Sequence, residues 1–167
     1  DQALRNKTIQ KTYHAIVTKQ DVLKEHDLID APIGRTDDSI INRCVRSDGK
    51  PSLTEYWLEE TYQHSQLVKI RLHTGRTHQI RVHFSWLGCP LLGDDLYGGE
   101  KIEPLVRQAL HCSQLDFVHP MTGEKMCVKA PFPTDMAEWI EEDRYKYIQI
   151  NFPIVLGRYQ PPMWSHR

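Results

Sequence analysis

The segment 67–88, LVKIRLHTGRTHQIRVHFSWLG, changes its periodicity once, and this change constrains the fold most. Apolar and basic residues alternate over 68–72, which is the period-two pattern of a half-buried β-strand. Glycine at the 74–75 break tolerates the backbone angles of a tight turn. The spacing then becomes helical, with Thr77 suited to the N-cap and Gly88 to the C-terminal end. The sequence therefore predicts a strand, a tight turn and a helix.

Positive charge is concentrated at this predicted turn. Residues 61–93 contain no Asp or Glu but four Lys or Arg and four His, in a chain with a formal net charge of −1. Arg76 and Arg81 lie near the start of the predicted helix, where a cation opposes the helix dipole by about 0.3–1 kcal/mol. A nearby anion would reverse that effect, so the pattern favours a phosphate or carboxylate site. A solvated charged face is the alternative.

The block LHTGRTHQIRVHFSWLGCPLLGDDLYGG (72–99) resembles the signature of the RluA-type RNA pseudouridine synthases. Four further segments resemble that family in the same order along the chain: KTYHAIV (11–17), GKPSLTEYWL (49–58), LHCSQLDFVHPMTGE (110–124) and PFPTDM (131–136). The resemblance covers about residues 7–140. It implies an α+β fold, with a mixed, mostly antiparallel sheet and packed helices, forming part of a catalytic domain. It also implies chemistry that needs no metal or cofactor.

The resemblance implies a role for individual residues. Tyr13 would stack on a uracil that has left its base stack, and Arg81 would pair with the nucleophilic carboxylate. Ile80 would pack against the base pocket, although core packing is an equal alternative. The RNA phosphates would be met by further basic residues: Arg76, His78, Lys11 and Lys69.

One element of the family pattern is missing. The nucleophilic Asp of the family lies in an R-L-D motif upstream of the K-x-Y strand, and no R-L-D occurs here. Only twelve residues precede Tyr13, and Asp1 is not the nucleophile. We therefore expect a C-terminal portion of a longer enzyme, or an active site completed by another polypeptide. Alone, the chain is expected to be inactive, to leave Arg81 free for phosphate, and to expose surface that favours self-association.

These patterns predict an RNA uridine isomerase that acts on rRNA or tRNA. A non-catalytic RNA-binding or interaction module on the same scaffold is the alternative, and a phosphate-ester hydrolase using His78 and Arg81 is less favoured. The five-residue spacing of His73, His78 and His83 does not match a helical zinc site, and no acidic residue accompanies them.

Composition restricts the remaining classes. The sequence suits one globular domain, and a net charge of −1 argues against a generally polybasic RNA binder. Four scattered cysteines without a C-x-x-C predict reduced thiols, and neither a signal-peptide pattern nor a long apolar run is present. We therefore expect an intracellular protein, cytoplasmic or organellar.

Several further elements are predicted from local patterns. The loop 93–99 either closes over substrate or, as we favour, supports the helix as a structural turn. The other predicted strands are 8–17, 53–58, which would pair antiparallel with 67–72, and a segment within 145–155. A hairpin is predicted from 115–119 and 126–129. Two further helices are predicted, one that opens at Glu103-Pro104 and one over 135–143 with Asp135 as N-cap. We assign 1–143 to the catalytic part and 144–167 to an extension.

Overall fold

A six-stranded sheet organises the computed structural model, which describes residues 8–153. Its strand order is β2-β5-β6-β1-β7-β8, and a separate two-stranded sheet pairs β3 with β4. The strands are β1 (Ile9–Thr18), β2 (His26–Asp30), β3 (Ile33–Arg35), β4 (Arg43–Val45), β5 (Leu53–Thr61), β6 (Ser65–Leu72), β7 (Leu110–Val118) and β8 (Lys125–Lys129). The helices are α2 (Gln79–Trp86), the short 3-10 helix η1 (Asp95–Tyr97) and α3 (Thr134–Asn151).

The predicted α+β class is confirmed. Every strand pairing within residues 8–153 is antiparallel. The expected pairing of 53–58 with 67–72 is present as β5 with β6, in a register that places Thr54 opposite Leu72. The expected hairpin is present as β7 and β8, with β7 beginning five residues earlier than predicted.

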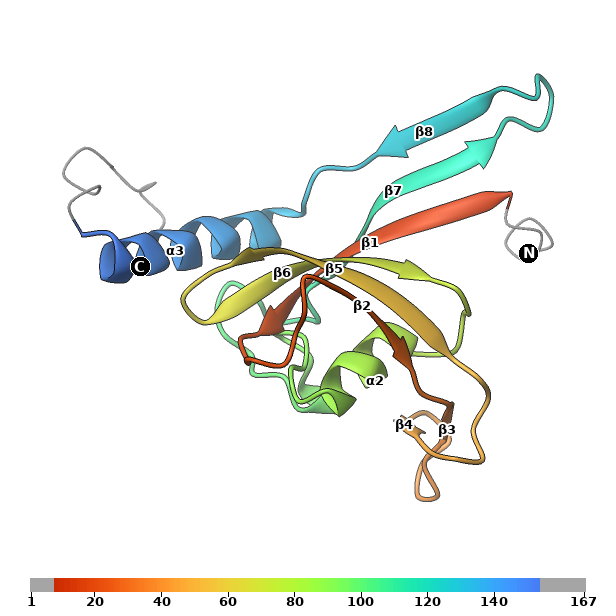
Figure 1. Cartoon of the computed structure of the whole chain (residues 1–167), viewed down its shortest axis with the longest axis horizontal. Helices are drawn as coiled ribbons and strands as arrows, with labels where there is room; N and C mark the ends of the chain where they lie inside the picture. Colours follow the sequence, from red (N-terminus) through yellow and green to blue (C-terminus); the bar gives the residue numbers. More distant parts are fainter. Residues whose placement is uncertain (1–7, 154–167) are drawn as a thin grey trace.

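The two faces of the large sheet carry separate cores. Side chains alternate between faces along a strand, so Ala15 and Ile16 point in opposite directions. Ala15 belongs to a core completed by Ile80 and Phe84 of α2. Ile16 belongs to a second core, which contains Trp139 and other residues of α3. The helices therefore cover opposite faces, as Figure 1 shows with α2 below the sheet and α3 at the upper left.

The N-terminal half of β1, together with β7 and β8, forms an arm that projects beyond the other strands (Figure 1). Residues 9–11 pair with β7, whereas pairing with β6 begins only at Thr12. On the face shared with Tyr13, the arm carries apolar side chains that include Phe117 and Val128, the latter 52% exposed. Apolar surface is therefore exposed on the face of Tyr13, farther along the arm.

Two predicted helix starts are wrong. Glu103 and Pro104, joined by a cis peptide bond, form a turn closed by the antiparallel bridge between Ile102 and Leu105. Pro104 therefore lies in a turn and does not open a helix. Asp135 lies inside α3, whose N-cap is Pro133. The Asp135 carboxylate instead accepts from the backbone N–H of Met136 and pairs with Arg107 at 3.0 Å. A carboxylate in the first turn is favourable to the helix dipole, but it does not cap the helix.

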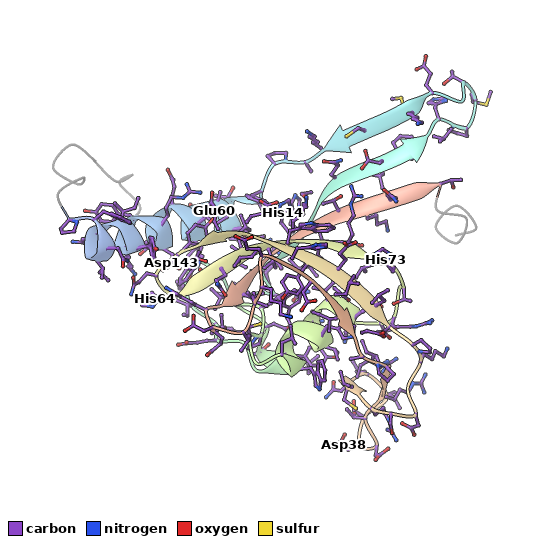
Figure 2. All side chains as sticks on the ribbon, in the orientation of Figure 1. His14, Asp38, Glu60, His64, His73 and Asp143 are labelled. Atoms are coloured by element: carbon purple, nitrogen blue, oxygen red, sulfur yellow. The ribbon has the colours of Figure 1, made fainter. Side chains whose placement is uncertain are left out.

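The predicted strand within 145–155 is also wrong over the described residues, and 154–155 lie outside them. The helix α3 continues to Asn151, so the boundary assigned after residue 143 falls inside it. Buried Asp143 anchors this helix: its carboxylate accepts from the His64 backbone N–H at 3.0 Å and from Ser65 Oγ at 2.6 Å. Figure 2 shows Asp143 beside His64 where α3 meets the sheet. Beyond Asp143, the helix also contacts the rest of the fold, since Arg144 pairs with Glu60 at 2.6 Å and the Tyr147 ring centroid lies 5.4 Å from Lys19 Nζ.

Free energy of unfolding is expected to fall as the pH drops from 7 to 5, because His83 is fully buried. Its Nε2 donates to the Ala31 carbonyl at 2.8 Å, and its Nδ1 pairs with the Thr54 hydroxyl at 2.7 Å. Burial lowers the pKa of His83, although the bond to Ala31 opposes this. The unfolded chain therefore takes up a proton near pH 6.5, before the folded chain does, and stability is lost below that pH. Urea unfolding at pH 7 and pH 5 measures this loss of stability. An NMR titration that gives His83 a pKa at or above 6.5 in the folded chain would contradict the prediction.

All four cysteines are free, with Cys89 buried and Cys112 and Cys127 exposed. No helix in the described part of the chain is long and apolar enough to span a membrane.

Candidate active site

Tyr13 lies in the middle of β1, where the core under α2 gives way to the open arm. It faces Ile70 of β6 and Cys112 of β7 across the sheet, and it packs against the α2 core while remaining partly exposed. Burial, and secondarily Cys112, raises the pKa of the Tyr13 hydroxyl above its ordinary value. Tyr13 therefore offers a neutral, fixed aromatic ring, which is suited to stacking.

The start of α2 differs from the sequence prediction. Thr77 is not the N-cap: His78 holds that position, with a positive φ of 56°. The side chain of Gln79 stabilises the turn instead, because its Oε1 accepts from the Arg76 N–H at 2.9 Å and from Thr74 Oγ1 at 2.8 Å. Its amide also donates to the Leu53 carbonyl and to Thr54. Gln79 thus joins the turn to β5, a role that local spacing does not reveal.

Arg81, the third residue of α2, has an internal anionic partner. Its Nε and Nη2 donate to the two carboxylate oxygens of Asp94 at 2.9 and 2.8 Å. The side chains of Arg81 and Asp94 are 15% and 1% exposed, and the Tyr97 ring lies 5.0 Å from the guanidinium carbon. The prediction that Arg81 is free for phosphate is therefore wrong: Asp94 compensates the cation in the first turn, and the bond to Asp94 raises the pKa of Arg81.

His78 is held by the same loop. Its Nδ1 lies 2.6 Å from the Tyr97 hydroxyl, which also accepts from the backbone N–H of Arg43. Burial lowers the pKa of His78, and the positive charges of Arg81 and Arg43 lower it further. A neutral imidazole is a weak phosphate ligand. With His78 and Arg81 both engaged by the loop, the pair that a phosphate-ester hydrolase would need is not free.

The loop that holds these side chains is the segment 93–99. Its structural contacts support the favoured prediction of a turn that buttresses the helix: Asp94 and Tyr97 contact Arg81, and Ser85 Oγ donates to the Tyr97 carbonyl at 2.6 Å. Asp94 and Tyr97 were not among the predicted site residues. The signal for Asp94 was the absence of any acidic residue between 61 and 93, which made it the first carboxylate after the arginines.

The four other predicted site residues lie in different surroundings. Ile80 is only 4% exposed and packs in the α2 core, which is the core alternative. Arg76 stays near the surface, and its Nε donates to the Pro51 carbonyl at 2.9 Å. Lys11 is exposed on the same face as Tyr13, two residues along β1. Lys69 lies opposite His14 in register, on the other face, with its Nζ 4.6 Å from the Trp57 ring centroid. Lys69 therefore does not extend a patch around Tyr13.

The three histidines at five-residue intervals do not form a cluster. His73 pairs with Glu55, His78 with Tyr97, and His83 with Thr54 and Ala31. Within residues 8–153, no group of three or more His, Cys, Asp or Glu side chains is arranged to hold a metal ion.

Solved structures define the class of this fold. The human protein RNA pseudouridylate synthase domain containing 1 aligns with a TM-score of 0.64 and 30% identity, over 78% of this chain and 57% of that chain. A second human protein, RNA pseudouridylate synthase domain containing 4, shares the fold, with a TM-score of 0.66 and 22% identity. The alignment covers 83% of this chain and 64% of that chain. The sheet and helices are thus those of a pseudouridine synthase catalytic domain.

The chain belongs to the RNA pseudouridylate synthase family, whose model matches residues 1–86. The uncharacterised RNA pseudouridine synthase YjbO of Bacillus subtilis is 44% identical over 143 residues, covering 86% of this chain and 50% of that protein. Ribosomal large subunit pseudouridine synthase D of Vibrio vulnificus is 40% identical over 152 residues, covering 83% and 46%. The chain thus spans about half the length of these curated relatives, and the RluA-type resemblance is confirmed.

Proposed function

We propose that this chain is the C-terminal catalytic part of an enzyme that converts uridine to pseudouridine in RNA. The observation that carries this proposal is the shared face of Tyr13 and α2. A half-buried ring lies on the face covered by the helix of Arg81, beside the open apolar surface of the arm. This arrangement provides an aromatic surface for an unstacked base and a fixed cation for a nearby anion.

Each residue has a defined part in the proposed reaction. The N1–C1′ bond of uridine breaks and a C5–C1′ bond forms, while C5 loses its proton and N1 gains one. Tyr13 stacks on the extruded uracil, repaying about 1–3 kcal/mol of the unstacking cost. Arg81 pairs with the nucleophilic carboxylate and keeps it ionised. That carboxylate is supplied by sequence upstream of residue 1 or by another polypeptide.

The experiment that tests this proposal is tritium release from RNA labelled at uridine C5. It compares this chain with a version that includes the coding sequence preceding it in its gene. Release by the extended protein alone is the expected result. If neither protein releases tritium from a broad RNA pool, the isomerase proposal fails and a non-catalytic RNA-binding module replaces it. Release by the chain alone would place a nucleophile within residues 1–167.

The partner we propose is structured RNA, either rRNA or tRNA, in an intracellular compartment. One curated relative is named for the ribosomal large subunit, which makes rRNA the first substrate to test. The open apolar surface of the arm, which includes Val128, is the proposed contact for the upstream part of the enzyme. In the chain alone, the same surface would support self-association.

RNA affinity is expected to depend on Arg76 through charge alone. Arg76→Ala removes one cation from the turn before α2, so it should weaken RNA binding and reduce the slope of log K against log salt by about 1. Lys69→Ala is the matched control, since Lys69 lies on the opposite face of the sheet from Tyr13. Equal effects of the two substitutions on affinity between 50 and about 200 mM salt would contradict the assignment of RNA to the Tyr13 face.

A further inference from the structure

One side chain of β7 holds the residues on both sides of Tyr13. Ser113 Oγ donates to the Thr12 carbonyl at 3.2 Å and lies 2.6 Å from His14 Nδ1. Thr12 and His14 are the neighbours of Tyr13 in β1, and successive side chains of a strand point to opposite faces. The Ser113 hydroxyl therefore binds β1 from the face opposite to the Tyr13 ring.

This contact lies at an irregularity in the pairing of β1 with β7. Thr12 lies opposite Gln114. Tyr13 lies opposite Cys112, which leaves Ser113 as the extra residue of a β-bulge. A bulge disrupts the hydrogen-bond ladder locally and changes the direction of neighbouring side chains. The backbone before Tyr13 therefore depends on the Ser113 hydroxyl as well as on the ladder.

His14 connects this contact to a further strand. Its Nε2 lies 3.1 Å from a carboxylate oxygen of Glu59 in β5. Its ring packs edge-on against Phe132, with 5.2 Å between the ring centroids, and its side chain is only 15% exposed. Figure 2 shows His14 near the base of the arm. Ser113, His14 and Glu59 thus form a hydrogen-bonded brace that joins β7, β1 and β5.

Tyr13 needs this support because of its place in the sheet. Residues 9–11 of β1 pair with β7, and pairing with β6 begins at Thr12. Within the described residues, the strand before Thr12 therefore has one paired neighbour, and the bulge interrupts that pairing directly before Tyr13. A ring that is already held in its bound orientation loses less conformational freedom when a base stacks on it.

We propose that Ser113 and His14 are positioning residues, which fix the backbone of β1 so that Tyr13 presents its ring to the uracil in one orientation. This inference rests on the proposed function. Neither side chain touches RNA or the reacting atoms, because they meet on the face of the sheet opposite to the ring. Both act through Tyr13.

The test measures equilibrium binding of the protein with its upstream sequence to a transcript of large-subunit rRNA. Ser113→Ala leaves the Thr12 carbonyl and His14 Nδ1 without this partner. It should weaken binding roughly three- to tenfold, which is part of the loss expected when the Tyr13 ring is removed. Ser113→Thr keeps a hydroxyl and suits a strand, so it should retain the wild-type affinity. In a Tyr13→Ala background, Ser113→Ala should cause no further loss.

Gln114→Ala is the matched control. Gln114 is the next residue of β7, and its amide donates to Asp116 of the same strand at 2.8 Å, so its substitution should leave the affinity unchanged. NMR signals of the Tyr13 ring provide a measurement without RNA. They should move toward the positions of an unrestrained tyrosine in Ser113→Ala, and in His14→Phe, but not in Gln114→Ala. Thermal unfolding of every variant measures the folded fraction.

The inference is wrong if folded Ser113→Ala keeps either the affinity or the Tyr13 ring signals of the wild type. It is also wrong if Ser113→Thr loses as much affinity as Ser113→Ala, or if the loss persists in the Tyr13→Ala background. Should Ser113→Ala not fold, the same criteria apply to His14→Phe. Failure of the unmodified extended protein to release tritium is a different outcome: it rejects the proposed function, whereas the ring signals decide whether the brace holds Tyr13.

Discussion

Arg81→Ala is expected to lower the free energy of unfolding by about 3–5 kcal/mol, because it leaves the Asp94 carboxylate buried without its partner. The Asp94 side chain is only 1% exposed, so water cannot replace the lost guanidinium without opening the loop. Urea unfolding of the chain measures the difference. Arg76→Ala is the comparison, and we expect a change within about 0.5 kcal/mol because its guanidinium is near the surface.

Arg81→Lys separates stability from activity. Lysine keeps the positive charge near Asp94 but replaces a two-point contact with a single donor, so the expected loss of stability is smaller, about 1–2 kcal/mol. Activity of the extended protein should nevertheless fall far more than this stability loss explains, because a lysine ammonium does not reproduce the planar fork that pairs with a carboxylate. If Arg81→Ala costs less than about 1 kcal/mol, the Asp94 carboxylate is not buried against Arg81 in solution.

Tyr13→Ala is expected to weaken binding of substrate RNA by the extended protein by about 1–3 kcal/mol, or roughly five- to more than a hundredfold. Stacking requires the ring and not the hydroxyl. Tyr13→Phe should therefore retain most of the affinity. Equilibrium binding to an RNA that contains the target uridine measures both variants.

Tyr147→Ala provides the control for Tyr13→Ala. Tyr147 is a partly buried tyrosine on α3, where Lys19 Nζ lies 5.4 Å from its ring centroid. Its removal should not change RNA affinity. If Tyr13→Phe loses as much affinity as Tyr13→Ala, the hydroxyl makes the decisive contact and stacking is not the role of this residue.

The spacing of apolar residues correctly predicted the strands and helices that bury one face against the core. The alternation over 68–72 gave β6, and the apolar spacing after Gly75 gave α2, because a strand or amphipathic helix must bury one face. Local capping patterns were less informative. Thr77 and Asp135 both had suitable side chains, but the N-caps are His78 and Pro133, and neither makes a side-chain capping hydrogen bond.

The candidate site was predicted in part. The family resemblance pointed to Tyr13 in the segment 11–17 and to Arg81 in the block 72–99. These residues lie 68 positions apart, and only the register of β1 with β6 places Tyr13 on the face of α2. Lys69 shows the limit of this reasoning. Its alternation with Val68 and Ile70 was visible in the sequence, but which face would carry Tyr13 depended on strand order.

The sequence alone determined the family, through the segments that resemble its signature, and the strand–turn–helix centre, through local periodicity. The same resemblance supplied Tyr13 and Arg81 as the candidate aromatic and cationic residues. Only the tertiary structure decided which groups meet. Asp94 binds Arg81 because the loop after α2 returns across the helix, and Asp143 anchors α3 to the β5–β6 turn through the His64 N–H. Such contacts join residues through packing in three dimensions, and no spacing along the chain specifies them.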